Sequence, residues 1–390
     1  MDIPKIQQYL TEQKIDGWLL YDFHARNEIA IKAMGLTSHL TRRSCYLIPA
    51  KGKPVALVNP IEKNKFAHLE GEVRIYRGYH GFEAEVAKIL SGFKTVAMEY
   101  SPMGRLPYIG LVDCGTIELV RSLGLKVVSS ADLVAAFQAR LSTKQIESHY
   151  RAAKLVNQTK DDAFAFIVDS LRAGKPISEY DVCRFMMDKF TSHGMIFDVA
   201  PNCSVDVNTG DPHYEPSEST SAPIKRDQLV LLDLWARLGD ADGVYADITW
   251  MAYTGKKSDI PVEYAKRFAV VVQARDAAVA FLKQHIGRRA VKGAEADDAC
   301  RAVIEKAGYG ALFTHRTGHS IGSNVHGDGP NIDNLETEDS RVLQSGHLFS
   351  IEPGIYDKDS GVRTEINCLI TDNGPEVTTL PQQTEIIALF

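Results

Sequence analysis

Short apolar stretches separated by turn residues dominate the first third of the chain, and their pattern predicts strands. They lie at 16–23, 44–60, 72–78 and 94–100. The second stretch is long enough for two strands around the turn Lys51–Pro54. A helical stretch at 130–141 follows. Strands and helices that alternate in this way predict an α/β domain over residues 1–141. We find no catalytic constellation within it.

Helical periodicity becomes prominent after Ser142. Four amphipathic stretches have the spacing of helices, at 148–174, 177–194, 263–287 and 294–308. The second begins with Ser178 as its cap and carries Asp181 at the third helical position, which is a capping-box pattern. Strand-like stretches lie between and after the helix pairs, at 229–238, 348–356 and 361–371. Residues 142–390 are therefore predicted to form an α+β domain in which helix pairs and strands occur twice.

The composition is that of a globular protein, with 44% hydrophobic and 24% charged residues over a length of 390. The length is too great for one ordinary core, which agrees with two domains. The net charge is −6 and no long basic run occurs, which argues against nucleic acid or an anionic membrane as a partner. Apolar runs are too short to span a bilayer, and the N-terminus lacks a signal-peptide core. Six scattered cysteines without a CxxC motif lead us to expect a reduced, cytoplasmic protein.

A glycine-rich segment, HRTGHSIGSNVHG at 315–327, contains three histidines. The spacing of His315 and His319 is that of a helical zinc motif. However, glycines interrupt the segment, and each costs about 1 kcal/mol in a helix interior. We therefore expect strand and turn here. Alternate side chains of a strand face opposite sides, so the three imidazoles need not share a function.

Two pairs of strands place acidic residues beside each other. The first pair is joined by a Gly- and Asp-rich turn at 239–243. If this turn is centred on Asp240, Asp233 lies directly opposite Asp247, and Trp235 lies opposite Tyr245. Asp240 and its neighbour Asp242 are interpreted as turn residues only.

The second pair is joined by the turn at 357–361. If this turn is centred between Lys358 and Asp359, Glu352 lies opposite Glu365. A single acidic residue beside a turn is usually solvated or caps the turn. Opposed like charges destabilise a sheet, and a buried unpaired carboxylate is costly. Two such pairs therefore favour a cationic partner between them, and two divalent ions would balance four carboxylates. Carboxylate and imidazole ligands suit manganese, cobalt or zinc.

These segments together resemble the pita-bread metallopeptidases, a family that includes aminopeptidase P, prolidase and methionine aminopeptidase. The matching motifs are LVLLDLW, YADIT, HRTGHSIG, FSIEPG and GVRTEI, in that order. The resemblance implies five metal ligands, which are Asp233, Asp247, His319, Glu352 and Glu365. Residues 142–390 look like the catalytic domain. Residues 1–141 look like the creatinase/prolidase N-terminal domain.

The resemblance also implies roles for residues around the metals. His213, in NTGDPHY, and His326, in NVHG, would contact the substrate and the developing oxyanion. Glu352 would also move the proton during catalysis. His315 would support the loop, and Arg363 would orient Glu365 or bind an acidic group. The expected activity is that of an Xaa-Pro dipeptidase with two divalent ions, acting on small peptides with proline in second position. The family is commonly dimeric, so a homodimer is expected.

Some positions depart from the usual family pattern and leave alternatives open. Trp235 stands where relatives have glycine, and Trp250 stands where many have arginine. No arginine occurs in GDGPNID at 327–333, where many prolidases bind the substrate carboxylate. An Xaa-Pro aminopeptidase is therefore the alternative to a dipeptidase. A creatinase-like hydrolase and a non-catalytic binding protein on the same fold are also considered, but the intact ligand set argues against both.

Overall fold

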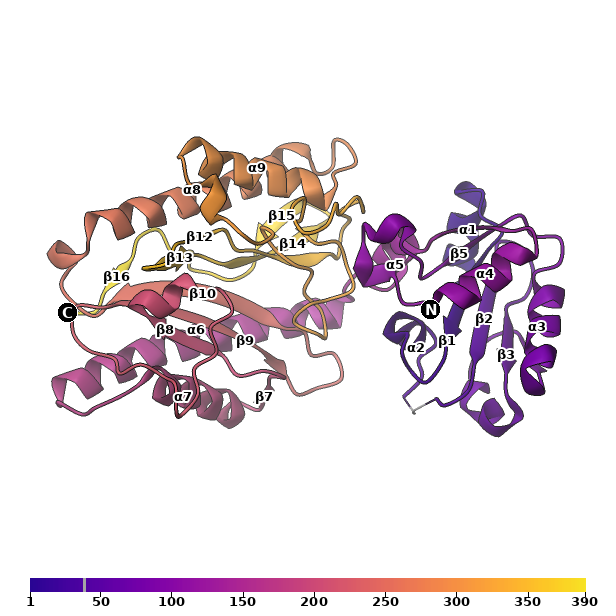
Figure 1. Ribbon diagram of the computed structural model, residues 1–390, viewed down its shortest axis with the longest axis horizontal. Coiled ribbons are helices and arrows are strands. Elements are labelled where there is room, and N and C mark those ends of the chain that lie inside the picture. Colours follow the sequence, from indigo (N-terminus) through magenta and orange to yellow (C-terminus); the bar gives the residue numbers. More distant parts are fainter. Residues whose placement is uncertain (38–39) are drawn as a thin grey trace. The chain divides into compact units, whose positions relative to one another are not determined.

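The computed structural model describes residues 1–37 and 40–390, and these residues divide into two compact units. The first unit comprises Met1–Gln138 and the second comprises Ala139–Phe390. Figure 1 labels the helices and strands of both units. Within the described residues, no helix combines the length and the apolar character needed to cross a membrane.

The first unit is a six-stranded mixed sheet with helices on both faces, which confirms the α/β prediction. The strand order is β4-β3-β2-β1-β5-β6, in which β1–β2 and β2–β3 are antiparallel and the other neighbours are parallel. The strands are β1 (Gly17–Asp22), β2 (Ser44–Pro49), β3 (Val55–Val58), β4 (Glu72–Ile75), β5 (Thr95–Met98) and β6 (Lys126–Ser129). The helices are α1 (Ile3–Glu12), α2 (Glu28–Ala33), α3 (Gly78–Ile89), α4 (Cys114–Ser122) and α5 (Ala131–Phe137).

Alternation along β1 explains why its stretch is apolar throughout. Trp18 and Leu20 pack on the face covered by α1, α2 and α5. Leu19 and Tyr21 pack on the opposite face, under α3 and α4. Because successive side chains of a strand point to opposite faces, a strand with helices on both sides is apolar at every position.

The second unit contains two helix pairs with strands between them, as Figure 1 shows, and this confirms the predicted α+β domain. The helices are α6 (Thr143–Arg172), α7 (Glu179–Ser192), α8 (Val262–His285) and α9 (Gly293–Lys306). One sheet has the order β16-β10-β9-β7, with β8 also paired to β9. Its strands are β7 (Met195–Ile196), β8 (Asn202–Val205), β9 (Leu229–Leu238), β10 (Ala246–Tyr253) and β16 (Ile387–Ala388).

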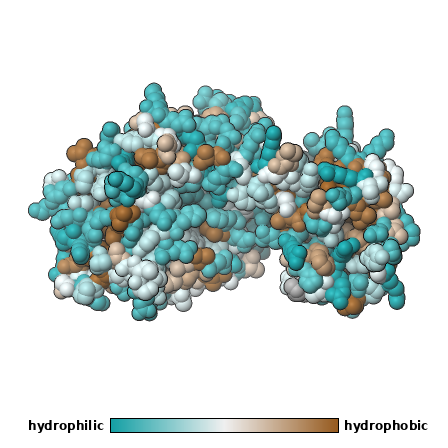
Figure 2. Space-filling model, in the orientation of Figure 1, coloured by the Kyte–Doolittle hydropathy of each residue, from teal (hydrophilic) through white to brown (hydrophobic). Residues whose placement is uncertain are grey.

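The remaining strands form a three-stranded sheet, β11-β14-β15, and the pair β12–β13. They are β11 (Leu348–Ile351), β12 (Gly354–Tyr356), β13 (Gly361–Arg363), β14 (Ile366–Thr371) and β15 (Gly374–Val377). Helices α8 and α9 pack against this group in one apolar core, and α6 and α7 pack against β9 and β10 in another. The face of this unit in Figure 2 is mainly hydrophilic, with scattered hydrophobic residues.

Both helices of the first pair begin at capping boxes. Ser178 and Asp181 cap α7 reciprocally, as predicted. Ser142 and Gln145 do the same for α6. As a result α6 begins at Thr143, five residues before the apolar periodicity that marked the helix in the sequence. The polar first turn of α6 is therefore specified by its cap rather than by burial.

His149 of α6 is a buried histidine that joins three parts of the second unit. Its Nδ1 lies 2.8 Å from the carbonyl oxygen of Tyr245, and its Nε2 lies 2.6 Å from the hydroxyl of Thr378. Burial lowers the pKa of this imidazole to about 4, against the opposing effect of the Tyr245 carbonyl. The folded protein therefore holds His149 neutral.

The low pKa of His149 predicts a loss of stability in acid. The unfolded chain binds this proton near pH 6.5 and the folded chain only near pH 4, so the contribution is complete above 6.5 and is lost as the pH falls toward 4. At about 1.36 kcal/mol per pH unit, the unfolding free energy should fall by about 3 kcal/mol from this group. Urea unfolding in EDTA at pH 7 and pH 4.5 measures it. The His149→Gln variant should show a shallower pH dependence, and an unchanged one would contradict the assignment.

Candidate metal centre

The inner face of the β9–β10 hairpin carries the first two candidate ligands. Leu232 and Leu234 point into the core under α6 and α7, which leaves Asp233 on the opposite face. The structure pairs Asp233 with Thr249 and Asp247 with Trp235. The prediction that Asp233 and Asp247 are directly opposed is therefore wrong, as is the pairing of Trp235 with Tyr245.

The error is a shift of two residues in the register. The turn lies one residue later than predicted, so each residue of β9 meets a partner two positions further along β10. Because the side-chain period of a strand is two, this shift changes partners without changing faces. The two aspartates are diagonal neighbours on the same face, a relation that typically separates residues by about 7–8 Å.

The second pair of acidic residues has the predicted register. Ile351 pairs with Ile366, and Gly354 pairs with Arg363, so Glu352 and Glu365 lie across from each other between these pairs. The backbone N–H of Glu352 donates to the carbonyl of Thr317 at 2.7 Å, and that of Glu365 donates to Thr249 at 3.2 Å. At the two glutamates the backbone therefore does not continue the hydrogen-bond ladder between these strands. It donates instead to the neighbouring segments that carry the other candidate ligands.

The histidine segment at 315–327 runs beside these strands. It contains isolated bridges, Gly318 with Ile332 and Ser320 with Phe349, but no regular strand among these residues. The predicted strand is therefore reduced to single bridges between bends. A Cβ on Gly318 would lie 1.9 Å from the carbonyl oxygen of Ser350, so only glycine permits this close approach. The contact brings the backbone N–H of His319 to the Ser350 hydroxyl at 2.9 Å.

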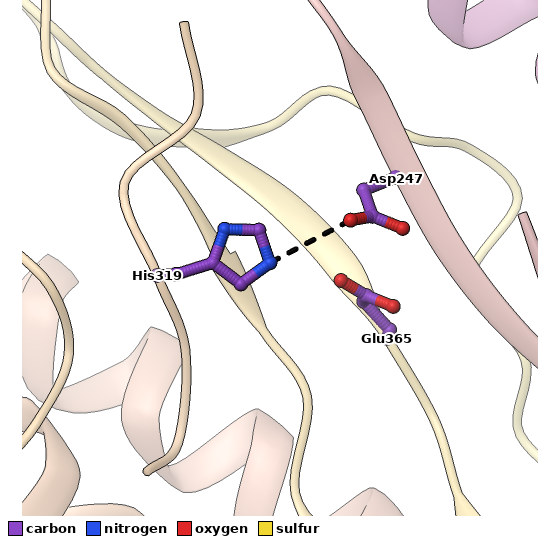
Figure 3. Close-up of side chains that lie close together, drawn as sticks. All are labelled: Asp247, His319 and Glu365. Carbon is purple, nitrogen blue, oxygen red and sulfur yellow. Dashed lines mark ion pairs between the residues drawn. The ribbon is translucent and has the colours of Figure 1, made fainter. Parts of the chain in front are cut away.

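Three candidate ligands converge in the centre of the site. The side chains of Asp247, His319 and Glu365 point toward one another from β10, the histidine segment and the residue just before β14 (Figure 3). All three are buried, and one potential ligand atom of each lies within 4.8 Å of the others. Nε2 of His319 lies 3.5 Å from Oδ2 of Asp247 and 3.4 Å from Oε1 of Glu352.

Asp233 joins this group through Thr249 and Arg363. The Thr249 hydroxyl lies 3.1 Å from Oδ1 of Asp233 and 2.8 Å from Oε2 of Glu365. Arg363 donates from Nη2 to Oδ2 of Asp233 and from Nε to Thr249 at 2.9 Å. The guanidinium therefore lies against Asp233, and it reaches Glu365 only through the threonine hydroxyl. The acidic group that Arg363 binds is therefore Asp233, one of the candidate metal ligands.

The carboxyl groups are electrostatically crowded. Burial raises the pKa of Asp247 to about 7, and the charge of Asp233 adds to this effect. Burial also raises the pKa of Glu365 well above its usual range, with further contributions from Asp247 and Glu352. Glu352 behaves differently, because His319, His315 and Arg363 outweigh burial and lower its pKa. Asp247 and Glu365 therefore ionise together here only if a further cation, in addition to Arg363, balances their charge.

Two orphaned oxygens fit a metal ion. Oδ1 of Asp247 and Oε1 of Glu365 are buried and have no hydrogen-bond partner among the described residues. Buried carboxylate oxygens are almost always satisfied, and metal coordination is one of the few ways to satisfy them without a donor. Together with the imidazole of His319, these oxygens form a donor set that suits a divalent ion such as manganese, cobalt or zinc.

His326 lies at the edge of this cluster, and His213 lies near His326. The rings of His326 and His319 have centroids 4.4 Å apart in an edge-to-face arrangement. Although His326 is exposed, partial desolvation by the surrounding protein lowers its pKa, and His319 and Arg316 lower it further. His213 is exposed on the loop before β9 and is close enough for its charge to depress the pKa of His326.

The structure adds supporting residues that the sequence did not reveal. Tyr356 places its hydroxyl 2.9 Å from Nε2 of His315 and 3.4 Å from Nη1 of Arg363. His315 therefore supports the site through Tyr356. The sequence could have indicated Thr249, because it lies two residues after Asp247 in the same strand and must point to the same face. No local pattern marks Tyr356, because its partners come from distant segments.

A buried cluster of carboxylates and one imidazole, with two carboxylate oxygens that lack a hydrogen-bond partner among the described residues, is the kind of donor set that binds divalent metal ions. Residues 149–372 match the model of metallopeptidase family M24. The chain belongs to this family. The family implies metal ions, and the buried Asp247, His319 and Glu365 are consistent with them.

Relatives in sequence are named as peptidases. The chain is 32% identical over 263 residues to the uncharacterized peptidase YqhT of Bacillus subtilis. The aligned region covers 65% of this chain and 67% of the relative. It is 28% identical over 298 residues to an Xaa-Pro dipeptidase of Pyrococcus horikoshii, with 76% of each chain covered. It is 38% identical over 168 residues to an Xaa-Pro dipeptidase of Lactobacillus helveticus, but it spans only 41% of that enzyme.

Solved structures share the two-domain fold over nearly the whole chain. Dipeptidase PepE from Mycobacterium ulcerans superposes with a TM-score of 0.74 at 20% identity, covering 99% of this chain and 96% of that one. The prolidase from P. horikoshii superposes with a TM-score of 0.64 at 23% identity, covering 98% and 99%. At these identities the likeness establishes the fold, an N-terminal α/β domain followed by a pita-bread domain.

Proposed function

We propose that this protein is a peptidase that uses two divalent metal ions to hydrolyse Xaa-Pro bonds, as an Xaa-Pro dipeptidase. The observation that carries the proposal is a pair of buried carboxylate oxygens, on Asp247 and Glu365 beside His319, which have no hydrogen-bond partner within residues 1–37 and 40–390. Membership of family M24 supports a peptidase, and two of the relatives above are named Xaa-Pro dipeptidases. The small peptide substrate would carry proline in second position.

Five residues would hold the ions, namely Asp233, Asp247, His319, Glu352 and Glu365. Manganese, cobalt or zinc would suit these ligands. The ions, when bound, would activate a water molecule and polarise the peptide carbonyl. Arg363 would hold the Asp233 carboxylate in place through its contacts with Asp233 and Thr249.

Glu352 is the candidate for proton transfer. Its low pKa keeps it ionised and able to accept a proton from the attacking water. The Ser350 hydroxyl donates to Oε1 of Glu352 at 2.9 Å and fixes its orientation. As the water oxygen bonds to the carbonyl carbon and the C–N bond breaks, the same carboxyl group would deliver the proton to the proline nitrogen.

The two outer histidines would contact the substrate. A neutral His326 can donate a hydrogen bond from one ring nitrogen to the oxygen on which negative charge develops. His213, which is exposed, would contact the residue after the cleaved bond. Such preorganised donors typically contribute about 10²–10³-fold to kcat.

An Xaa-Pro aminopeptidase is the second candidate, and one observation favours it. The segment 327–333 contains no arginine to bind the carboxylate of a dipeptide. Without such a cation the pocket could accept a longer peptide that continues beyond proline. The two activities share the same hydrolytic chemistry, and they differ only in whether the substrate ends at the proline or extends past it.

Proline release distinguishes the two candidates. Manganese-loaded protein is expected to cleave Ala-Pro, and EDTA should abolish this cleavage. Cleavage of the first bond of Ala-Pro-Ala but not of Ala-Pro would establish the aminopeptidase instead. Cleavage of neither would reject the Xaa-Pro activity and direct the search to other amide substrates.

A further inference from the structure

The loop that carries His213 has little support from regular structure. Between β8 and β9 it contains the short 3-10 helix η4 (Asp206–Gly210) and a polar stretch with isolated turns. No described residue hydrogen-bonds to the His213 imidazole, which is exposed. Its backbone N–H donates to Oδ1 of Asp211 at 3.0 Å. The position of His213 therefore depends on how the backbone around it is held.

One buried side chain holds this loop at several points. Glu179, the first residue of α7, has no exposed surface. Oε1 of Glu179 accepts from the backbone N–H of Val205 at 2.8 Å and from Nδ2 of Asn208 at 2.9 Å. Oε2 accepts from the hydroxyl of Tyr214 at 2.7 Å and from the backbone N–H of Ala222 at 2.7 Å.

These donors bracket the histidine. Val205 lies where the loop begins, Ala222 lies close to its end, and Tyr214 directly follows His213. The carbonyl of Tyr214 also accepts from Nδ2 of Asn202, so this residue is held at both its backbone and its side chain. The N-terminus of α7 favours a negative charge at the Glu179 position. A single carboxylate thus fixes both ends of the loop and the residue next to the imidazole.

We propose that Glu179 is a positioning residue that sets the place of His213 in the active site. This inference rests on the proposed function, in which His213 contacts the substrate. Among the described residues, Glu179 hydrogen-bonds to no candidate metal ligand, and its effect would pass through Tyr214 and the loop backbone.

The arrangement of donors explains why a carboxylate is required. Oε1 of Glu179 faces the backbone N–H of Val205, and Oε2 faces the backbone N–H of Ala222. Because both N–H groups belong to the backbone, they cannot rotate away as a hydroxyl could. In a Glu179→Gln variant the amide nitrogen must face one of these two N–H groups, whichever way the amide turns. The buried N–H of Val205 or the partly buried N–H of Ala222 then lacks an acceptor, and the loop must shift to restore a hydrogen bond. A displacement of about 1 Å can cost about 10²-fold in rate.

The test is a double-mutant cycle on the manganese-loaded protein. Glu179→Gln, His213→Ala and the double variant are compared for kcat and KM on the cleaved Xaa-Pro peptide. Tyr214→Phe serves as a milder variant, because it removes one hydrogen bond beside His213 and keeps the ring. Glu99→Gln is the matched control, since Glu99 is equally buried in the first unit and accepts from Trp18, Asn27 and Ser130.

We expect Glu179→Gln to lower kcat by about 10–100-fold with metal content unchanged. The double variant should be within about threefold of His213→Ala, because both changes remove the same function. Tyr214→Phe should show a smaller loss in the same parameter, and Glu99→Gln should show none. Losses that multiply in the double variant, or an unaffected kcat in Glu179→Gln, would overturn the proposal. If Glu179→Gln fails to fold, the same cycle with Tyr214→Phe decides.

A measurement without substrate separates this proposal from the proposed function. Hydrogen–deuterium exchange should rise in peptides covering 202–223 of Glu179→Gln and remain unchanged in those covering β9 and β10. If the wild-type protein cleaves no Xaa-Pro peptide, the proposed function fails while raised exchange still supports Glu179 as the anchor of the loop. Unchanged exchange in 202–223 would overturn the anchoring role whatever the activity.

Discussion

Replacing Asp247 by alanine is expected to abolish metal-dependent hydrolysis. Asp247 is buried, lies 3.5 Å from Nε2 of His319, and presents an oxygen with no hydrogen-bond partner among the described residues. An ion at such a site stabilises transition-state charge by several kcal/mol, and a loss of about 5 kcal/mol corresponds to about 10⁴-fold in kcat/KM. The Asp247→Ala protein should also retain less metal after dialysis.

The control for this variant is Asp240→Ala in the turn of the same hairpin. Asp240 is exposed, and among the described residues its carboxylate makes only a long ion pair with Arg151 at 4.0 Å. Its replacement should leave both hydrolysis and metal content unchanged. The two variants are compared at equal concentrations of added manganese. An Asp247→Ala protein that remains fully metallated and active would show that Asp247 is not a ligand.

Metal binding is expected to stabilise the second unit strongly. Without ions, burial and mutual repulsion raise the pKa values of Asp233, Asp247 and Glu365. Keeping these groups ionised therefore destabilises the metal-free fold. A ligand at a thousand times its Kd contributes about 4 kcal/mol per site. For a domain of 150–250 residues, each kcal/mol shifts Tm by about 2–4 °C, so one site should raise Tm by about 8–16 °C.

Scanning calorimetry with manganese and with EDTA measures this shift. The Asp247→Ala variant should show little increase in Tm on addition of manganese, since it lacks a central ligand. The wild type and Asp240→Ala should respond alike. Equal Tm values for the wild type in manganese and in EDTA would mean that no ion binds the folded protein tightly.

Local patterns in the sequence were sufficient for the faces of the strands but not for all of their partners. Alternation in LVLLDLW predicts that Asp233 faces away from Leu232 and Leu234, and the structure agrees. The partner of Asp233 depends on the length of the turn, and the Gly- and Asp-rich stretch at 239–243 allows more than one centre. The turn at 357–361 allowed the correct register for Glu352 and Glu365.

Contacts between distant segments were beyond prediction from local patterns. Arg363 and Asp233 are 130 residues apart in the chain, and Thr249 and Glu365 are 116 apart. Their proximity depends on how two sheets pack, which no spacing within either segment encodes. The role of Glu179 was also beyond prediction, because in the sequence it is an ordinary acidic residue in the first turn of a helix. Only its four hydrogen-bond donors, which lie between Val205 and Ala222, reveal its role.

The number of metal ions bound per chain decides whether the buried cluster is a dinuclear site. Purified protein saturated with manganese and freed of excess ions can be analysed by inductively coupled plasma mass spectrometry. We predict two ions per chain and their loss together with peptide hydrolysis on treatment with EDTA. A protein that binds no divalent ion under these conditions would contradict this prediction, because Asp233, Asp247, His319, Glu352 and Glu365 would then form a buried cluster without the cation that we infer.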